Sequence, residues 1–207
     1  MTMHDPTDKY QGEISPGAMR VAKAVSFVTQ PTILSIPTFI LLCLSIQNTM
    51  DCLMTMAVCL VTAVVLPIIN VHYYSVKFNN DDGDIYRRED RFMPLLIGTV
   101  CYAVGVVALW LIDAPWLITV LMICYALCTF SIMLISTRWK ISIHATGIMG
   151  PSIALGIAYP PYGFLYMLLL PAIAVCRYYQ KKHTPAQIVG GALFGGILTT
   201  LVFLLML

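Results

Sequence analysis

Charged side chains are scarce in this sequence. Only 11% of its 207 residues are Asp, Glu, Lys or Arg, whereas 59% are hydrophobic, and the mean hydropathy is +0.83. A soluble domain carries about 25% charged and 45–50% apolar residues. Too few polar side chains are present to cover a water-soluble globule. The composition therefore predicts an all-helical, polytopic membrane protein.

Further absences narrow the function. The net charge is only +2 and no long run of Lys or Arg exists, which argues against nucleic acid as a partner. The seven cysteines form no Cys-x-x-Cys pair, so neither a disulfide framework nor a thiolate metal site is indicated. Residues 1–20 are polar and lack the charged-then-apolar order of a cleavable signal peptide, so we expect a polar N-terminal segment.

Long apolar stretches organise residues 21–207 into a single transmembrane domain. Five stretches have about the 20 residues that a bilayer core requires; they cover roughly 23–47, 53–76, 92–112, 115–136 and 186–207. Two shorter stretches, at roughly 145–159 and 163–177, flank a Pro-Pro-Tyr-Gly turn and predict a hairpin partly sunk in the membrane. We therefore predict a bundle of six or seven transmembrane helices.

The polar segments 77–94, 137–147 and 176–187 are predicted to share one membrane face. An even number of crossings separates each from the next, and the N-terminus should lie there too. These segments contain the basic residues Arg87, Arg88, Arg91, Arg138, Lys140, Arg177, Lys181 and Lys182, whereas the opposite connections contain no Lys or Arg. The positive-inside rule alone would explain this asymmetry. An anion site shared by the three segments would explain it as well.

Each segment carries a short motif: RREDRFMP at 87–94, RWKISIHATG at 138–147 and CRYYQKKHTPAQ at 176–187. In this order they resemble the three signatures of the type 2 phosphatidic-acid phosphatase superfamily, Lys-(six)-Arg-Pro, Pro-Ser-Gly-His and Ser-Arg-(five)-His-(three)-Asp. The resemblance covers residues 87–195, about half the chain. It departs from the family at Gln187, which replaces Asp, and at Asp84, which replaces the Lys of the first signature. We expect Arg88 or Arg87 to act in place of that Lys, one helical turn from Arg91.

The resemblance implies a metal-independent lipid phosphate phosphatase that needs no cofactor and works through a phosphohistidine. It implies His183 as the nucleophile, His144 as the general acid and Arg177 as their catalytic partner. Guanidinium, ammonium and hydroxyl donors suit phosphate oxygens, and the expected phosphate ligands are Arg91, Arg88, Ser142 and Lys140. The expected substrate is a lipid phosphate or diphosphate, and the expected location is the cell (inner) membrane, crossed several times.

Gln187 admits two interpretations. Its side-chain carbonyl could accept a hydrogen bond from Nδ1 of His183 and orient that nucleophile, although without the negative charge of the family Asp. The run Thr184-Pro185-Ala186-Gln187 also fits a capping box at the start of a helix. If the orienting role fails, turnover would be slow, or the protein would be a non-catalytic lipid-phosphate binder.

Two magnesium-dependent enzyme classes remain as alternatives. Asn80, Asp81 and Asp84 faintly resemble the first metal motif of membrane prenyltransferases, and the Asp-Gly pair at 82–83 resembles the start of the CDP-alcohol phosphotransferase motif. The further acidic motif that either chemistry needs to hold its metal is missing from the sequence. A transporter or channel is disfavoured, because the long apolar stretches contain essentially no charged residues.

Overall fold

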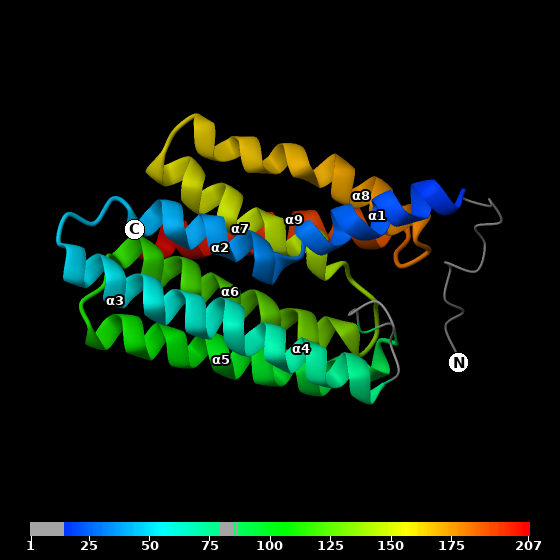
Figure 1. Cartoon of the computed structure of the whole chain (residues 1–207), viewed down its shortest axis with the longest axis horizontal. Helices are drawn as coiled ribbons and strands as arrows, with labels where there is room; N and C mark the ends of the chain where they lie inside the picture. The colour runs from blue at the N-terminus through cyan, green and yellow to red at the C-terminus, as the bar shows by residue number, and fades with distance from the viewer. Residues whose placement is uncertain (1–14, 79–84, 86) are drawn as a thin grey trace.

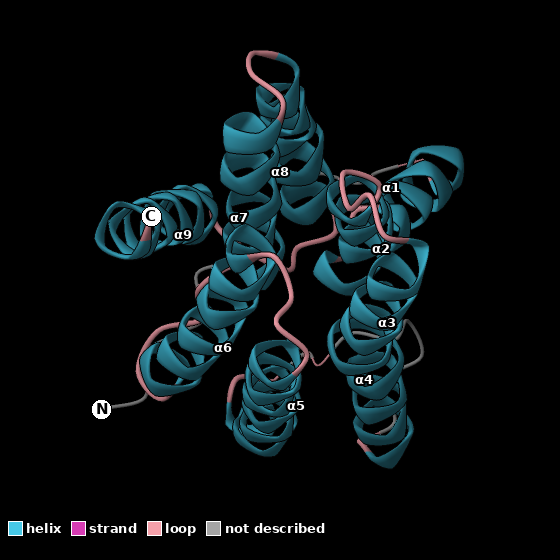
Figure 2. Cartoon of the chain, turned by 90° about the vertical axis from the view of Figure 1, so that its left-hand side faces the viewer, coloured by secondary structure: helices cyan, strands magenta, loops and turns pink. Residues whose placement is uncertain are grey.

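The protein is an elongated bundle of helices. The computed structural model describes residues 15–78, 85 and 87–207, and that part of the chain contains helices and connections but no strand. The helices run along the long axis of the molecule (Figure 1) and surround a common centre when viewed along that axis (Figure 2). Their bounds are α1 Pro16–Val28, α2 Pro31–Cys43, α3 Thr49–Leu60, α4 Leu66–Lys77, α5 Phe92–Leu111, α6 Trp116–Ser136, α7 Ile143–Ala158, α8 Leu169–Tyr179 and α9 Pro185–Met206.

Several helical segments are long and apolar enough to cross a membrane. Among the described residues, five qualify by length and composition: Thr49–Lys77, Glu89–Leu111, Trp116–Ser136, Tyr162–Tyr179 and Pro185–Met206. The pair α1 and α2, bent by 46°, makes a sixth if it is counted as one span. The 16 residues of α7 are apolar but shorter. The predicted all-helical, multi-pass bundle is therefore confirmed.

Proline breaks the first span. Pro31 is the first residue of α2 and has no N–H to continue the hydrogen bonds of α1. The backbone N–H of Gln30 turns to the carbonyl of Phe27 instead of the carbonyl of Ser26. The break therefore leaves the Ser26 carbonyl available to a side chain from another helix.

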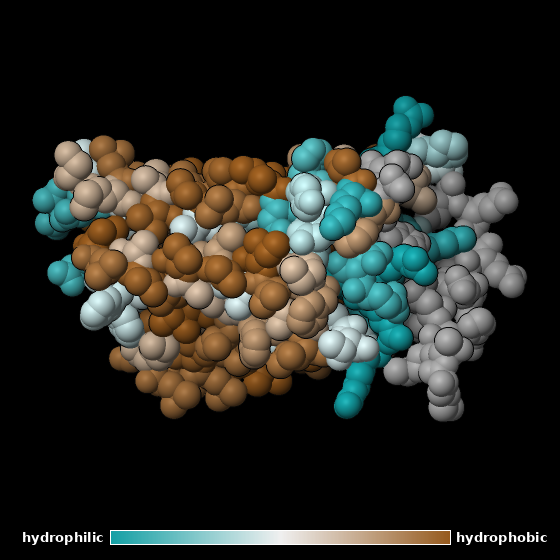
Figure 3. Space-filling view, turned by 90° about the horizontal axis from the view of Figure 1, so that it is seen from below, coloured by the Kyte–Doolittle hydropathy of each residue, from teal (hydrophilic) through white to brown (hydrophobic). Residues whose placement is uncertain are grey.

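The three basic segments meet at one end of the bundle. Helices α4, α6 and α8 end there, and α5, α7 and α9 begin there, as the even number of crossings predicts (Figure 1). The C-terminus lies at the other end, where Nε1 of Trp116 donates to the carbonyl of Met206 at 2.7 Å. Hydrophilic side chains gather toward the end with the basic segments, beside a broad hydrophobic surface (Figure 3). The fold thus concentrates the charge of the chain around one set of helix ends.

Close packing between α7 and α9 joins the second and third segments. A β-carbon on Gly191 would lie 2.6 Å from the carbonyl oxygen of Ser142, and one on Gly195 would lie 2.6 Å from the carbonyl oxygen of Thr146. The hydroxyl of Thr146 also donates to the carbonyl of Gly191 at 3.0 Å. Small residues allow such close approach in membrane bundles. The contact fixes the starts of α7 and α9 relative to each other.

Candidate active site

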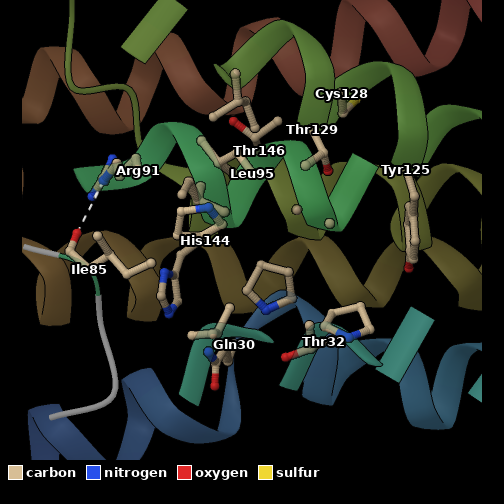
Figure 4. A pocket seen from close by; sticks show the side chains of 18 of the residues that line it. Gln30, Thr32, Ile85, Arg91, Leu95, Tyr125, Cys128, Thr129, His144 and Thr146 are labelled. Atoms are coloured by element: carbon tan, nitrogen blue, oxygen red, sulfur yellow. Dashed lines mark hydrogen bonds between the residues drawn. The ribbon is translucent and has the colours of Figure 1, made fainter. Parts of the chain in front are cut away.

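A cavity of about 140 Å³ begins among the three basic segments and is lined by residues from α2, α4, α5, α6, α7 and α8 (Figure 4). Four of the residues predicted to form the site line it: Arg91, His144, Arg177 and His183. They come from all three segments, so the fold brings together residues that lie up to 92 positions apart in the sequence.

His183 is held in a defined tautomer. Its side chain is 1% exposed, and its Nδ1 lies 3.2 Å from the carbonyl oxygen of Lys140 and 3.3 Å from Oε1 of Gln187. Both partners only accept hydrogen bonds, so Nδ1 carries a proton, and in the neutral imidazole the lone pair is then on Nε2. A neutral imidazole with the lone pair on Nε2 is the form that can attack phosphorus.

Gln187 caps its helix and contacts His183 at the same time. Its Oε1 accepts the backbone N–H of Thr184 at 3.1 Å, while its own N–H donates to Oγ1 of Thr184 at 3.3 Å, which completes a capping box. Because a backbone N–H can only donate, the side-chain oxygen of Gln187 must face it. The same oxygen contacts the imidazole of His183. The two interpretations of Gln187 are therefore compatible, since the cap holds the oxygen beside Nδ1.

His144 lies in the first turn of α7, and its imidazole contacts the backbone of α1. Its Nε2 is 3.2 Å from the carbonyl oxygen of Ser26, which can only accept, so Nε2 is the donor. Gln180, from the third segment, donates to Oγ of Ser26 at 2.6 Å and to the carbonyl of Ala22 at 2.7 Å. The third segment thus holds Ser26, the residue of α1 that orients His144.

The two arginines of the cavity are both 2% exposed. Arg91 precedes α5, and its Nε and Nη1 donate to the carbonyls of Ile85 and Ile141, each at 3.2 Å. Its guanidinium therefore ties the first segment to the second while lining the cavity. Arg177 lies in the last turn of α8, six residues before His183. Both planar forks are placed where they can bind phosphate oxygens.

Three further residues were predicted as phosphate ligands, and the structure does not bring them into the cavity. Ser142 is fully buried as the N-cap of α7, where its hydroxyl accepts the N–H of Ala145 at 3.4 Å. Lys140 is buried and contributes its backbone carbonyl to His183. Arg88 forms an ion pair with Glu89 at 2.8 Å and donates to the carbonyl of Arg138 at 2.9 Å. These contacts orient the segments that carry the cavity residues.

Among Asp, Glu, His, Lys and Arg, only basic residues are buried in the described part of the chain. They are Arg91, Lys140, His144, Arg177, Lys182 and His183, and the buried residues of that part include no Asp or Glu. Arg91 and Arg177 place positive charge at the basic end of the cavity, which suits an anionic ligand.

The acidic segment of the magnesium-dependent alternatives, with Asp81, Asp82 and Asp84, lies outside the described residues. Within residues 15–78, 85 and 87–207, no three His, Cys, Asp or Glu side chains are grouped as metal ligands would be. Loss of activity on addition of a chelator would distinguish these alternatives from a metal-independent enzyme.

A stripe of hydroxyl residues escaped the sequence-based prediction of the site. Within the first apolar stretch, hydroxyl side chains recur at every third position and all of them are buried: Ser26, Thr29, Thr32, Ser35 and Thr38. Two members, Thr32 and Ser35, line the cavity. The regular spacing of polar residues in an apolar stretch was the signal that could have revealed that this stripe lines part of the cavity.

No protein-family model, curated protein or solved structure matches this chain. The function therefore rests on the chemistry of the cavity and on the three motifs that form it.

Proposed function

We propose that this protein is an integral membrane phosphatase that hydrolyses a lipid phosphate or diphosphate through a phosphohistidine, without a metal cofactor. The observation that carries the proposal is the meeting of His183, with its lone pair on Nε2, and two buried arginines at the end of one cavity. A nucleophile beside fixed positive charge is what phosphoryl transfer requires. The surrounding bundle gives the lipid portion of a substrate an apolar environment.

In the first step, Nε2 of His183 attacks phosphorus and the bond from phosphorus to the lipid oxygen breaks. Arg91 and Arg177 stabilise the negative charge on the transferring phosphoryl oxygens. His144 in its imidazolium form carries two N–H groups. One donates to the Ser26 carbonyl, and the other protonates the departing lipid oxygen.

In the second step, water attacks the phosphohistidine. Neutral His144 accepts a proton from this water, the bond from phosphorus to Nε2 breaks, and inorganic phosphate leaves. Both histidines then regain their starting protonation states. The carbonyl of Lys140 and the oxygen of Gln187 keep the proton on Nδ1 of His183 throughout.

Phosphate release from a panel of lipid phosphates by the purified protein in detergent tests this proposal. We expect release from at least one lipid phosphate or diphosphate, at a rate that excess chelator leaves unchanged. Release that disappears with chelator would instead favour a magnesium-dependent transferase. Binding of lipid phosphates without release from any of them would favour a non-catalytic binder. The proposal also places the protein in the cell (inner) membrane, which fractionation checks.

Substitutions at Gln187 test the side-chain oxygen that contacts both His183 and the backbone N–H of Thr184. Gln187→Leu removes the oxygen beside His183, and a lost hydrogen bond of about 1 kcal/mol should lower kcat by about five- to tenfold. Gln187→Glu has the same length and keeps an oxygen beside His183. It also adds a negative charge that stabilises the positively charged ring that His183 has as a phosphohistidine, so we expect kcat to be retained or raised.

Thr184→Ala is the matched control for this pair. It removes the acceptor of the Gln187 N–H but leaves the oxygen of Gln187 beside His183. We expect a loss of about 1 kcal/mol in the free energy of unfolding with little change in kcat. Equal losses of kcat in Thr184→Ala and Gln187→Leu would show that only the helix cap matters.

A further inference from the structure

The cavity continues from its basic end into the middle of the bundle (Figure 4). Its α5 wall extends from the level of Arg91 to Tyr102, a distance of about 16 Å at 1.5 Å per residue. A phosphate group bound between Arg91, Arg177 and the histidines occupies only the first part of that length. The deeper part is therefore placed to receive the portion of a substrate that adjoins its phosphate.

The contact between α7 and α2 shows how far Thr32 lies from the basic end of the cavity. A β-carbon on Gly147 would lie 2.5 Å from the ring of Pro31, so α2 begins directly against this position. Gly147 follows His144 by three residues, a rise of about 4.5 Å. Thr32, the neighbour of Pro31, therefore lies nearly one helical turn deeper than the proposed acid His144.

The hydroxyl of Thr32 differs from its neighbours in the stripe. Oγ1 of Thr29 donates to the carbonyl of Val25, and Oγ of Ser35 donates to the carbonyl of Pro31, both at 2.7 Å. Thr32 is the second residue of α2, directly after the break at Pro31. It therefore has no regular helical turn before it whose carbonyl could accept a hydrogen bond from its hydroxyl. Its side chain is 7% exposed, and its Oγ1 has no hydrogen-bond partner among the described residues.

A buried hydroxyl without a partner carries a free-energy penalty that a ligand oxygen can remove. Thr32 lines the cavity, and Figure 4 shows its side chain together with those of the polar residues Gln30 and Thr129 around the same space. Hydrocarbon contributes much of the rest of this wall, including Leu95 and Ile132. A hydrogen-bond donor without a protein partner in such a wall can select a ligand by the position of one oxygen.

We infer that Thr32 forms a second subsite, which donates a hydrogen bond to an ester or ether oxygen a few bonds from the phosphate of the substrate. The inference rests on the proposed phosphatase function and adds a specificity-determining residue to it. An acylated glycerol phosphate carries such an oxygen. A polyprenyl or simple alkyl phosphate has only hydrocarbon there and would leave the hydroxyl of Thr32 buried against carbon.

Hydrolysis of diacylglycerol phosphate and of an alkyl phosphate with the same number of carbons tests this subsite. We expect the wild-type protein to prefer the diacylglycerol phosphate in kcat/KM. Thr32→Val keeps the shape of the side chain and removes the hydroxyl, so the preference should fall by about tenfold, the equivalent of one hydrogen bond. Thr32→Ser should retain the preference.

Thr119→Val provides a matched control. Thr119 is also buried, at 1% exposed, and its hydroxyl likewise has no partner in the described part of the chain, but it does not line the cavity. This substitution should leave the substrate preference unchanged. An equal loss in Thr119→Val and Thr32→Val would overturn the subsite, and so would a wild-type enzyme that prefers the alkyl phosphate.

Binding of non-hydrolysable phosphonate analogues separates the subsite from catalysis. We expect tighter binding of the diacylglycerol phosphonate than of the alkyl phosphonate, and Thr32→Val should remove the difference. This pattern in a protein that releases no phosphate would overturn the phosphatase and support the subsite. Equal affinity for both phosphonates, or no binding of either, would overturn the subsite. The same holds if Thr32→Val binds both phosphonates as the wild-type protein does, because the hydroxyl of Thr32 would then bind only water.

Discussion

Replacing His183 with asparagine is expected to abolish phosphate release and leave the bundle folded. Asparagine has no ring nitrogen to attack phosphorus, and loss of a nucleophile lowers kcat by about a thousandfold or more. Its amide N–H can still serve as a donor near the carbonyl of Lys140, so the melting temperature should change by only a few degrees. Acid-labile incorporation of labelled phosphate, measured after rapid quenching with a labelled lipid phosphate, should disappear together with turnover.

His72→Asn is the corresponding control for His183→Asn. His72 is exposed on α4 and does not line the cavity, so we expect kcat to stay within about twofold, as for most surface substitutions. Retention of most activity in His183→Asn would remove His183 as the nucleophile. Loss of activity together with unfolding would require the test to be repeated with His183→Gln, whose longer amide extends further toward the carbonyl of Lys140.

The sequence predicted the side of the bundle on which the polar residues meet better than it predicted which of them face the cavity. Counting apolar stretches was enough to place the three basic segments together, because each crossing of a bilayer needs a long apolar helix. Arg177 and His183 likewise line the same cavity, because the end of α8 and the start of α9 are joined by a short connection. These features depend on local sequence and on the membrane.

The orientation of individual side chains depends on contacts between distant segments. Arg88 and Arg91 look equivalent in the sequence, but Arg88 binds Glu89 and a carbonyl of the second segment, whereas Arg91 turns inward. Ser142 looks like a phosphate ligand, but its hydroxyl caps α7. The role of Ser26 arises from the break at Pro31, which makes its carbonyl available to His144. None of these outcomes follows from residue type and spacing alone.

Arg91→Ala is expected to lower both stability and turnover, because the guanidinium connects two segments and also faces the cavity. The carbonyls of Ile85 and Ile141 would lose their buried donors, at a cost of about 1–3 kcal/mol for each. Loss of a positive group from the transferring phosphoryl should reduce kcat by about a hundredfold or more. Thermal unfolding in detergent measures the first effect, and phosphate release well below the melting temperature measures the second.

Arg91→Lys and Arg88→Ala separate the effect of Arg91 on stability from its effect on kcat. Lysine keeps the charge but cannot donate from two directions at once, so Arg91→Lys should recover part of kcat and little of the stability. Arg88→Ala removes a partly exposed ion pair and one carbonyl contact, which typically costs about 0–1 kcal/mol, and kcat should change little. If Arg88→Ala reduces kcat as much as Arg91→Ala does, Arg88 must turn toward the phosphate when substrate binds. The basic end of the cavity would then be assembled by the ligand instead of being preformed by the fold.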